Sequence, residues 1–233
     1  MKILRYSYNK LIKIGFIVDN DKVINVEDLE LEKQLKLNTN EQYIIQNKLY
    51  NVEPIFLIEL INKKIIDGNE NYDKKKLIDL NKVKILSPIV KANSLRDAYS
   101  FKKHVEAGRK SRNLPMIKEF DDAPVYYYSN HMAITGPGDL FFNKKHLNKL
   151  DFELEIAIII GKKGKNIKVE EADQYIFAFM IMNDWSARDI QKKEMMLNLG
   201  PAKGKDFSTS LGPCMVTKNE IKKIKSRNGY IYD

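Results

Sequence analysis

The sequence predicts an α+β protein that is mainly β. Apolar residues occupy every second position from Phe152 to Ile158, which is the pattern of a β-strand. A second apolar run at 176–182 has the length and the Ile, Phe and Met content of a buried strand. Short strand-like segments separated by turn residues fill the first 26 residues. Three separate regions therefore favour sheet over helix.

The N-terminal region predicts a small β unit. Strands are expected at 2–8, 11–18 and 22–26, with a turn at 19–21. An amphipathic helix is expected at 54–61, ending by Gly68, and a strand at 83–89 leads into the rest of the chain. We therefore predict a small N-terminal domain at 1–85 and a second domain at 86–233.

The second domain is expected to begin with a helix from Ser94, a good N-cap, to a stop at Gly108. In such a helix Asp97 and His104 are two turns apart and share a face. A lone histidine is usually structural, and His131 and His146 are interpreted in that way. His104 is predicted to be functional because an acid lies on its own face.

The acidic strand carries the first candidate site. Glu153 and Glu155 share the face opposite the apolar residues, and the run continues into Ile159 and Ile160. The strand is too apolar for an exposed edge strand, so both of its faces are expected to be covered in the folded protein. Two buried carboxylates that point the same way repel each other unless a cation lies between them. Alternating glutamates are also typical of a solvated strand face. This pair alone does not decide between a cation site and a solvated face.

A third acid, Asp184, ends the apolar run at 176–182, and Ser186-x-x-Asp189 is a possible capping box for the helix that follows. If that helix begins at Asp184, Arg188 and Gln191 share its face. Hard oxygen ligands from two strands favour Mg²⁺, Mn²⁺ or Ca²⁺.

The segment 199–207 contains two glycines and a proline, so it is expected to be a close-packed loop. Such a loop could hold Lys205 against the acids or leave it as an ordinary surface lysine. The spacing of the residues does not choose between these two interpretations.

Composition excludes several classes of protein. The 233 residues include 40 Lys and Arg and 31 Asp and Glu, a formal net charge of +9. The basic residues are spread along the chain without a nucleic-acid motif, so we predict no nucleic-acid partner. No apolar run reaches the ~18 residues of a membrane span, and the first residues are not a secretory signal. We expect a cytoplasmic protein with no membrane partner. The single cysteine, Cys214, excludes a disulfide within the chain.

The end of the chain predicts a hairpin at 227–230, and the sequence stops at Asp233 soon after it. Either the sheet ends there or the chain is a fragment.

Taken together, four groups of residues resemble the fumarylacetoacetate hydrolase family over about residues 85 to 233. They are Glu153-x-Glu155, the run 183–191, the run 204–207, and Asp97-x-Tyr99 with His104. The resemblance implies a mixed β-sheet roll behind a small N-terminal β domain, a homodimer, and a Mg²⁺ site that Mn²⁺ or Ca²⁺ could also occupy. It further implies a substrate that is a small dicarbonyl acid such as an acylpyruvate.

The resemblance also implies a role for each matching residue. The metal ligands are Glu153, Glu155, Asp184 and, as a possible fourth, Asp97. His104 is the general base that activates water. The residues that touch substrate or support the site are Tyr99, Arg188, Gln191 and Lys205.

Two departures from the family pattern leave the reaction open. Family members typically continue further and supply a glutamate beside the catalytic histidine and a threonine loop for the substrate carboxylate. Met195 stands where a tyrosine is found in the hydrolase proper. The alternatives are a C–C bond hydrolase, an isomerase, decarboxylase or hydratase of 2-hydroxyhepta-2,4-dienedioate-like acids, and a truncated homologue that binds metal without turnover.

Overall fold

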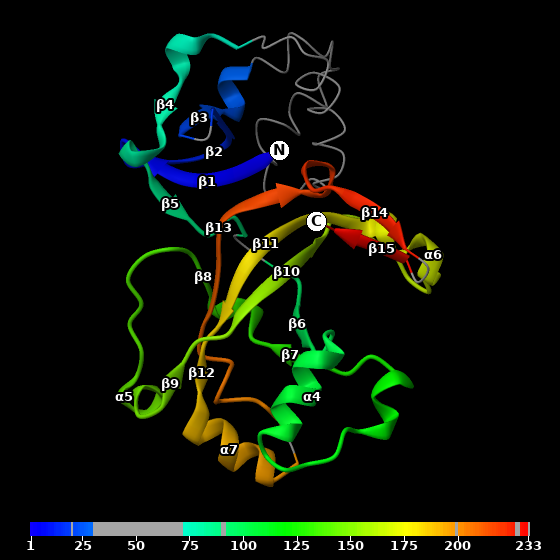
Figure 1. The fold of residues 1–233 in the computed structure, drawn as a ribbon. Coiled ribbons are helices and arrows are strands. Elements are labelled where there is room, and N and C mark those ends of the chain that lie inside the picture. The colour runs from blue at the N-terminus through cyan, green and yellow to red at the C-terminus, as the bar shows by residue number, and fades with distance from the viewer. Residues whose placement is uncertain (20, 30–71, 90–91, 199, 227–228, 233) are drawn as a thin grey trace.

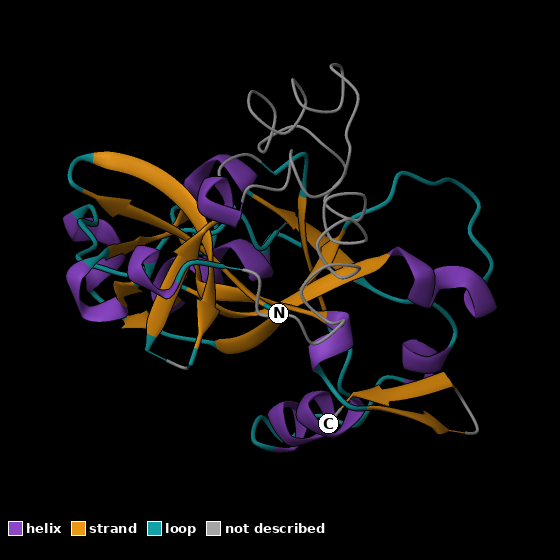
Figure 2. Ribbon diagram, turned by 90° about the horizontal axis from the view of Figure 1, so that it is seen from above, coloured by secondary structure: helices purple, strands orange, loops and turns teal. Residues whose placement is uncertain are grey.

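The computed structural model describes residues 1–19, 21–29, 72–89, 92–198, 200–226 and 229–232 (Figure 1). Their principal feature is a mixed sheet with the strand order β10-β11-β13-β1-β2-β3-β4. Strand β5 pairs with β1, and β8 pairs with β13 in parallel, whereas the other pairs are antiparallel. The mainly β, mixed-sheet architecture predicted from the sequence is confirmed. Seen from above, the helices lie around the outside of the strands (Figure 2).

The N-terminal strands form where the sequence predicted them. They are β1 (Lys2–Tyr8), β2 (Leu11–Val18) and β3 (Lys22–Asn25), followed by β4 (Ile78–Asp79) and β5 (Lys84–Leu86). Asn9 and Lys10 join β1 to β2, and both have positive φ, as a two-residue hairpin turn with the twist of its strands requires. The buried side chains include Leu4, Tyr6 and Val23. The helix predicted at 54–61 lies outside the described residues.

The N-terminal strands share one sheet with the strands of the second half. Lys2 and Ile3 of β1 are in register with Val216 and Met215 of β13. The amino terminus donates to Thr217 Oγ1 at 2.7 Å and to Glu220 Oε2 at 2.8 Å. Strands from both sides of the predicted boundary at residue 85 therefore pair within one sheet. The division into two domains at that residue stays a prediction.

Three antiparallel strands carry the second half: β10 (Leu154–Ile160), β11 (Ile176–Asp184) and β13 (Thr209–Thr217). The short strands β9 (Leu150–Asp151) and β12 (Ser186–Ala187) pair with each other. Helix α7 (Arg188–Met196) follows and lies at the end of the molecule opposite the N-terminal strands (Figure 1).

Helix α7 corrects the predicted helix start. It begins at Arg188 rather than Asp184, and Ala187 precedes it without a side-chain cap. The hydroxyl of Ser186 donates instead to the carbonyl oxygen of Asp184 at 3.0 Å. The predicted capping box is therefore wrong, because Ser186 belongs to β12 and its hydroxyl is bonded outside the helix.

The helix predicted at 94–108 is also wrong in its first half. Residues Leu95–Ala98 form strand β6, which pairs with β7 (Tyr126–Ser129), and helix α4 covers only Lys102–Lys110. The partner of β6 is about 30 residues away in sequence, so local patterning could not reveal it. Asp97 and His104 consequently do not share a helix face.

One face of β10 departs from expectation as well. Its glutamate side points inward, whereas the apolar side is exposed, with Leu154 75% exposed. Strand β10 also stands at the end of the described strand order. The expectation that both faces are covered is therefore wrong for the described part of a single chain.

Apart from several 3-10 turns, the other short helices and strands are β8 (Ile134–Thr135), α5 (Lys144–Leu147), α6 (Val169–Ala172), β14 (Lys223–Ser226) and β15 (Gly229–Tyr232). Strands β14 and β15 pair as the predicted hairpin, whose turn residues lie outside the description. The carboxylate of Asp173 holds this hairpin against the preceding chain, because it accepts hydrogen bonds from Lys218, Lys223 and Tyr232. Among the described residues, no helix has the length and apolarity needed to cross a membrane.

Candidate metal centre

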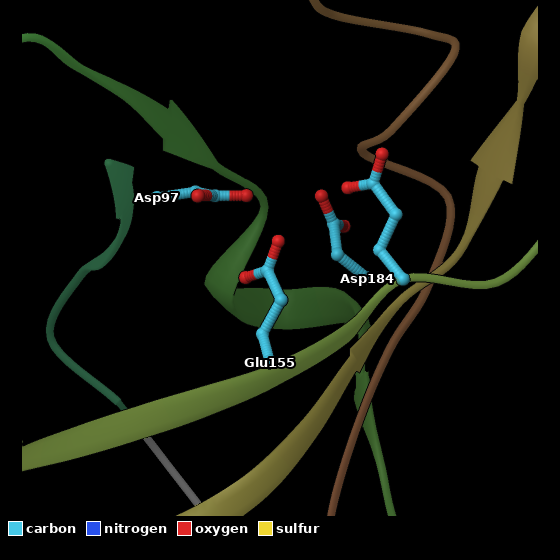
Figure 3. A group of neighbouring side chains, drawn as sticks. Asp97, Glu155 and Asp184 are labelled. Atoms are coloured by element: carbon cyan, nitrogen blue, oxygen red, sulfur yellow. The ribbon is translucent and has the colours of Figure 1, made fainter. Parts of the chain in front are cut away.

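Four carboxylates converge from three separate parts of the chain (Figure 3). Asp97 comes from β6, Glu155 from β10, Glu153 from the residue just before β10, and Asp184 from the end of β11. One oxygen of each lies within 4.8 Å of the others. The two-residue period of a strand puts both glutamates on one side, and the Asp184 N–H donates to the Glu153 carbonyl at 3.1 Å, which fixes the third acid beside them.

Asp184 has one satisfied oxygen and one unsatisfied oxygen. The residue is 2% exposed, and its Oδ2 accepts from Tyr127 at 2.6 Å and from Lys205 at 2.7 Å. Its buried Oδ1 has no partner in the described part of the chain. Burial raises the pKa of Asp184 to about 6. A buried oxygen without a donor is costly, and a cation would satisfy it.

Glu155 shows the same need for a cation. Burial, followed by the negative charges of Asp97, Asp184 and Glu153, raises its pKa to about 8. The charge of Lys205 acts in the opposite direction but does not outweigh these effects, so without a bound cation this acid is largely protonated at neutral pH. A divalent cation among the four acids would favour its charged form.

Glu153 is paired with two cationic side chains. Its Oε1 accepts from Arg188 Nη1 at 2.6 Å, and its Oε2 accepts from Lys205. Burial acts to raise its pKa, but these two contacts outweigh burial and lower it. When all four carboxylates are charged, the two cations Arg188 and Lys205 do not neutralise them, and Arg188 is also shared with Asp151. The donor type and the charge therefore fit Mg²⁺, Mn²⁺ or Ca²⁺.

Arg188 links the acidic cluster to α7. Its Nε donates to Asp151 Oδ2 at 2.8 Å, and its Nη1 donates to Gln191 Oε1 at 3.2 Å as well as to Glu153. Arg188 and Gln191, both predicted as site residues, thus lie beside the carboxylates. Asp151 was not predicted, although it continues the alternation of Glu153 and Glu155 by one step toward the N-terminus.

Lys205 reaches the cluster from the loop before β13. It is 2% exposed and forms ion pairs with Glu153 and Asp184. Burial lowers its pKa, but the charges and hydrogen bonds of Asp184 and Glu153 outweigh this effect and raise the pKa overall. The close-packed loop therefore holds the lysine against the acids, and the surface alternative does not apply.

Tyr127 is a site residue that the sequence interpretation missed. Its hydroxyl lies 2.7 Å from Asp97 Oδ2 and 2.6 Å from Asp184 Oδ2. Burial, then the charge of Asp184, raises its pKa far above the ordinary range of tyrosine. The signal was present: in the strand run at 126–128 the middle tyrosine must face away from its two neighbours.

Two predicted residues lie away from these contacts. His104 is exposed on the first turn of α4, and Tyr99 is exposed in the segment between β6 and α4. In the described structure neither side chain bonds to a carboxylate of the cluster. Their predicted roles as base and substrate contact stay predictions.

Comparison with known proteins supplies the family. The fumarylacetoacetate (FAA) hydrolase C-terminal model matches residues 94–228, more than half of the chain. Fumarylacetoacetase of Oryza sativa subsp. japonica is 33% identical over 183 residues, covering 68% of this chain and 41% of that protein. Oxaloacetate tautomerase YisK of Bacillus subtilis (strain 168) is 26% identical over 218 residues, covering 92% and 68%. The chain thus spans less than half the length of the rice relative.

Solved structures agree on the fold. The fumarylacetoacetate hydrolase of Exiguobacterium antarcticum superimposes with a TM-score of 0.56 at 21% identity, over 94% of this chain and 67% of that one. A structure described as Cg1458 with inhibitor matches with a TM-score of 0.61 at 18% identity, over 100% of this chain and 75% of that one. A maleylpyruvate hydrolase from Sphingobium matches with a TM-score of 0.57 at 15% identity, over 94% of this chain and 68% of that one. Hydrolases, tautomerases and isomerases all occur among the relatives and neighbours. From its motifs, its fold and the matching family model, the chain belongs to the fumarylacetoacetate hydrolase family.

Proposed function

We propose that this chain is a divalent-metal-dependent enzyme that cleaves a carbon–carbon bond in a small dicarbonyl acid of the acylpyruvate type. The observation that carries the proposal is the convergence of four carboxylates around the unpartnered Asp184 Oδ1. The ligands in this proposal are Asp97, Glu153, Glu155 and Asp184. Mg²⁺ is the expected ion, with Mn²⁺ or Ca²⁺ as substitutes.

A bound divalent ion would polarise a substrate carbonyl and stabilise the negative charge that develops on an enolate. The protein residues do the remaining work. Lys205 and Arg188 hold Glu153 in place and balance part of the negative charge. Gln191 and Tyr99, with Arg188, are assigned to contact the substrate. An imidazole nitrogen of His104 is assigned to take a proton from water.

A tautomerase, isomerase or decarboxylase is the second candidate, and a hydratase belongs to the same group. Relatives named oxaloacetate tautomerase and a neighbour named as a muconate isomerase support this group. The exposure of His104 supports it too, because moving a proton within a substrate needs no water positioned by that residue.

Metal binding is tested by thermal unfolding with and without millimolar Mg²⁺ or Mn²⁺. A ligand that binds only the native state at about 100 times its dissociation constant stabilises by roughly 2.7 kcal/mol, which raises the melting temperature by several degrees. Glu155→Ala should lose this shift, whereas Glu171→Ala, at an exposed position on α6, should keep it. Equal shifts in all three proteins would contradict the ligand assignment.

The reaction class is tested by two assays on the metal-loaded protein. Cleavage of acylpyruvates supports the hydrolase, and accelerated enol–keto conversion of oxaloacetate without cleavage supports the second candidate. His104→Ala should abolish cleavage and leave the metal-induced melting shift intact. Surviving cleavage would show that His104 is not the base, and metal binding without either reaction would mean that the site is idle.

We also propose that the chain forms a homodimer, as the family resemblance implies. The exposed apolar face of β10 supports this, since single chains seldom leave such a row uncovered.

A further inference from the structure

We propose that Glu194 is a positioning residue that fixes Lys205 in the acidic cluster by organising the loop between them. The seating of Lys205 follows from contacts in the described chain. Its consequence for metal affinity rests on the proposed function.

The carboxylate of Glu194 holds three consecutive backbone amides of the loop. The N–H groups of Ala202, Lys203 and Gly204 donate to it at 3.1, 2.7 and 3.1 Å. Successive backbone amides that converge on one anion form a nest, a concave site that favours negative charge. Here the anion is a side chain of α7, so the shape of the loop depends on that helix.

A tight steric contact fixes the same loop against the same helix. A Cβ added to Gly204 would lie 2.7–2.8 Å from the backbone N and Cα and from the Cβ of Gln191. Gln191 and Glu194 are three positions apart, on one side of α7. The Gly204 carbonyl also accepts from the Ala187 N–H at 2.8 Å. The backbone just before Lys205 is therefore held from two directions.

Lys205 depends on this support. Its ammonium reaches Asp184 Oδ2 at 2.7 Å and also contacts Glu153, in a position that is 2% exposed. Ordering a long lysine side chain costs rotamer entropy, and the ammonium is well hydrated in water. A loop released from Glu194 would allow the lysine to leave the cluster for solvent.

Only a carboxylate serves all three amides well. Glutamine offers one acceptor oxygen, and its NH₂ group would face backbone N–H donors instead of accepting from them. Charged acceptors also form hydrogen bonds about twice as strong as neutral ones. Glu194→Gln therefore keeps the size of the side chain but weakens its hydrogen bonds to the three loop amides.

The seating of Lys205 is measured by acetylation with acetic anhydride, followed by mass spectrometry. Lys203 lies in the same loop and is exposed, so the ratio of Lys205 to Lys203 labelling corrects for global differences. In the wild type and in the control Glu171→Gln the ratio should be low. It should rise several-fold in Glu194→Gln, and an unchanged ratio in the folded variant would overturn the proposal. If Glu194→Gln does not fold, Glu194→Asp, whose shorter carboxylate reaches fewer of the amides, should raise the ratio in its place.

A double-mutant cycle separates action through Lys205 from a general structural role. Calorimetric titration with MnCl₂ should show affinity reduced about 10-fold or more in Glu194→Gln and in Lys205→Met, the usual effect of removing groups that orient metal ligands. The double variant should bind no more weakly than Lys205→Met alone. Additive losses would overturn the proposed route. If the wild type binds no Mn²⁺, the proposed function fails, while the labelling ratio still tests the role of Glu194.

Discussion

At the scale of single residues, the acids of the cluster differ in how their charge is accommodated. Glu153 has two cationic partners, and its pKa is lowered despite burial. Glu155 has no such ion pair among the described residues, and its pKa is raised to about 8. In the metal-free protein the charged form of Glu155 is therefore unfavourable, because the residue is buried among other acids. The stability of the metal-free protein should depend on pH for this reason.

We expect the metal-free protein to lose stability as pH rises from about 5 to about 8. Unfolded Glu155 has a pKa near 4.3 and the native one about 8, so the native state binds the extra proton across this window. Stability falls with pH wherever the native state binds more protons than the unfolded state. Urea unfolding in EDTA should show this fall in the wild type and a smaller one in Glu155→Gln. Asp184, with a pKa of about 6, contributes only to the lower part of the window. Identical slopes in both proteins would contradict the assignment to Glu155.

Tyr127 provides a second residue-scale prediction. Its hydroxyl contacts Asp97 and Asp184 at 2.7 and 2.6 Å in a partly buried position. Hydrogen bonds to charged groups contribute about 1.5–3 kcal/mol, so Tyr127→Phe should lower the free energy of unfolding by about that amount. Tyr126→Phe is the matched control, because this neighbour faces outward and is exposed. Equal effects of the two substitutions in urea unfolding would show that the hydroxyl of Tyr127 does not support the acids.

At the scale of elements, the strands that local residue patterns define were predicted correctly from the sequence. Strands β1 and β2 are joined by a two-residue turn, and both were predicted with their observed bounds. Strand β6 was predicted as helix, because its character comes from pairing Asp97 with Tyr127 across about 30 residues. The alternation at 126–128 sets Tyr127 apart from its two neighbours, but only the pairing with β6 places it beside Asp97. The proposed ligand pair Glu153 and Glu155 was accessible from sequence, since their shared face follows from strand period alone.

Two glycine substitutions test how tightly the Lys205 loop packs on α7. Gly204→Ala would place a Cβ 2.7–2.8 Å from Gln191, so it should destabilise the protein by about 1–3 kcal/mol. Gly108→Ala in α4 is the matched control, because the nearest atom is 4.0 Å away on the Arg112 side chain. Alanine in an open helix position should stabilise by about 0.5–1 kcal/mol. Opposite signs in urea unfolding are expected, and a neutral Gly204→Ala would contradict the close contact.

At the scale of the whole molecule, β10 separates two environments. Its inward side places Glu155 in the acidic cluster, and its outward side presents an apolar row at the end of the described sheet. The row consists of large apolar residues that are each more than half exposed: Phe152, Leu154, Ile156, Ile158, Ile160 and, on β11, Ile181. A large aromatic side chain buries about 150–250 Å²; Leu and Ile are somewhat smaller, so these six partly exposed residues offer on the order of 600 Å². A standard interface buries about 800 Å² per partner, so a second copy placed on this row would bury most of the area that a stable dimer needs.

The dimer prediction follows from this area and from the symmetry of the row. A two-fold axis brings the same patch of both chains together, and an alternating aliphatic strand can pack against a second copy of itself. Ile156→Lys should therefore convert the protein from dimer to monomer in size-exclusion chromatography with light scattering. Val169→Lys, at a residue on α6 that is 90% exposed, should leave the dimer intact. A monomeric wild type would contradict the homodimer, and a dimeric Ile156→Lys would place the interface elsewhere. Because Ile156 and Glu155 lie on opposite faces of β10, the monomeric variant should keep its Mn²⁺-induced melting shift, so loss of the dimer would be distinguished from loss of the fold.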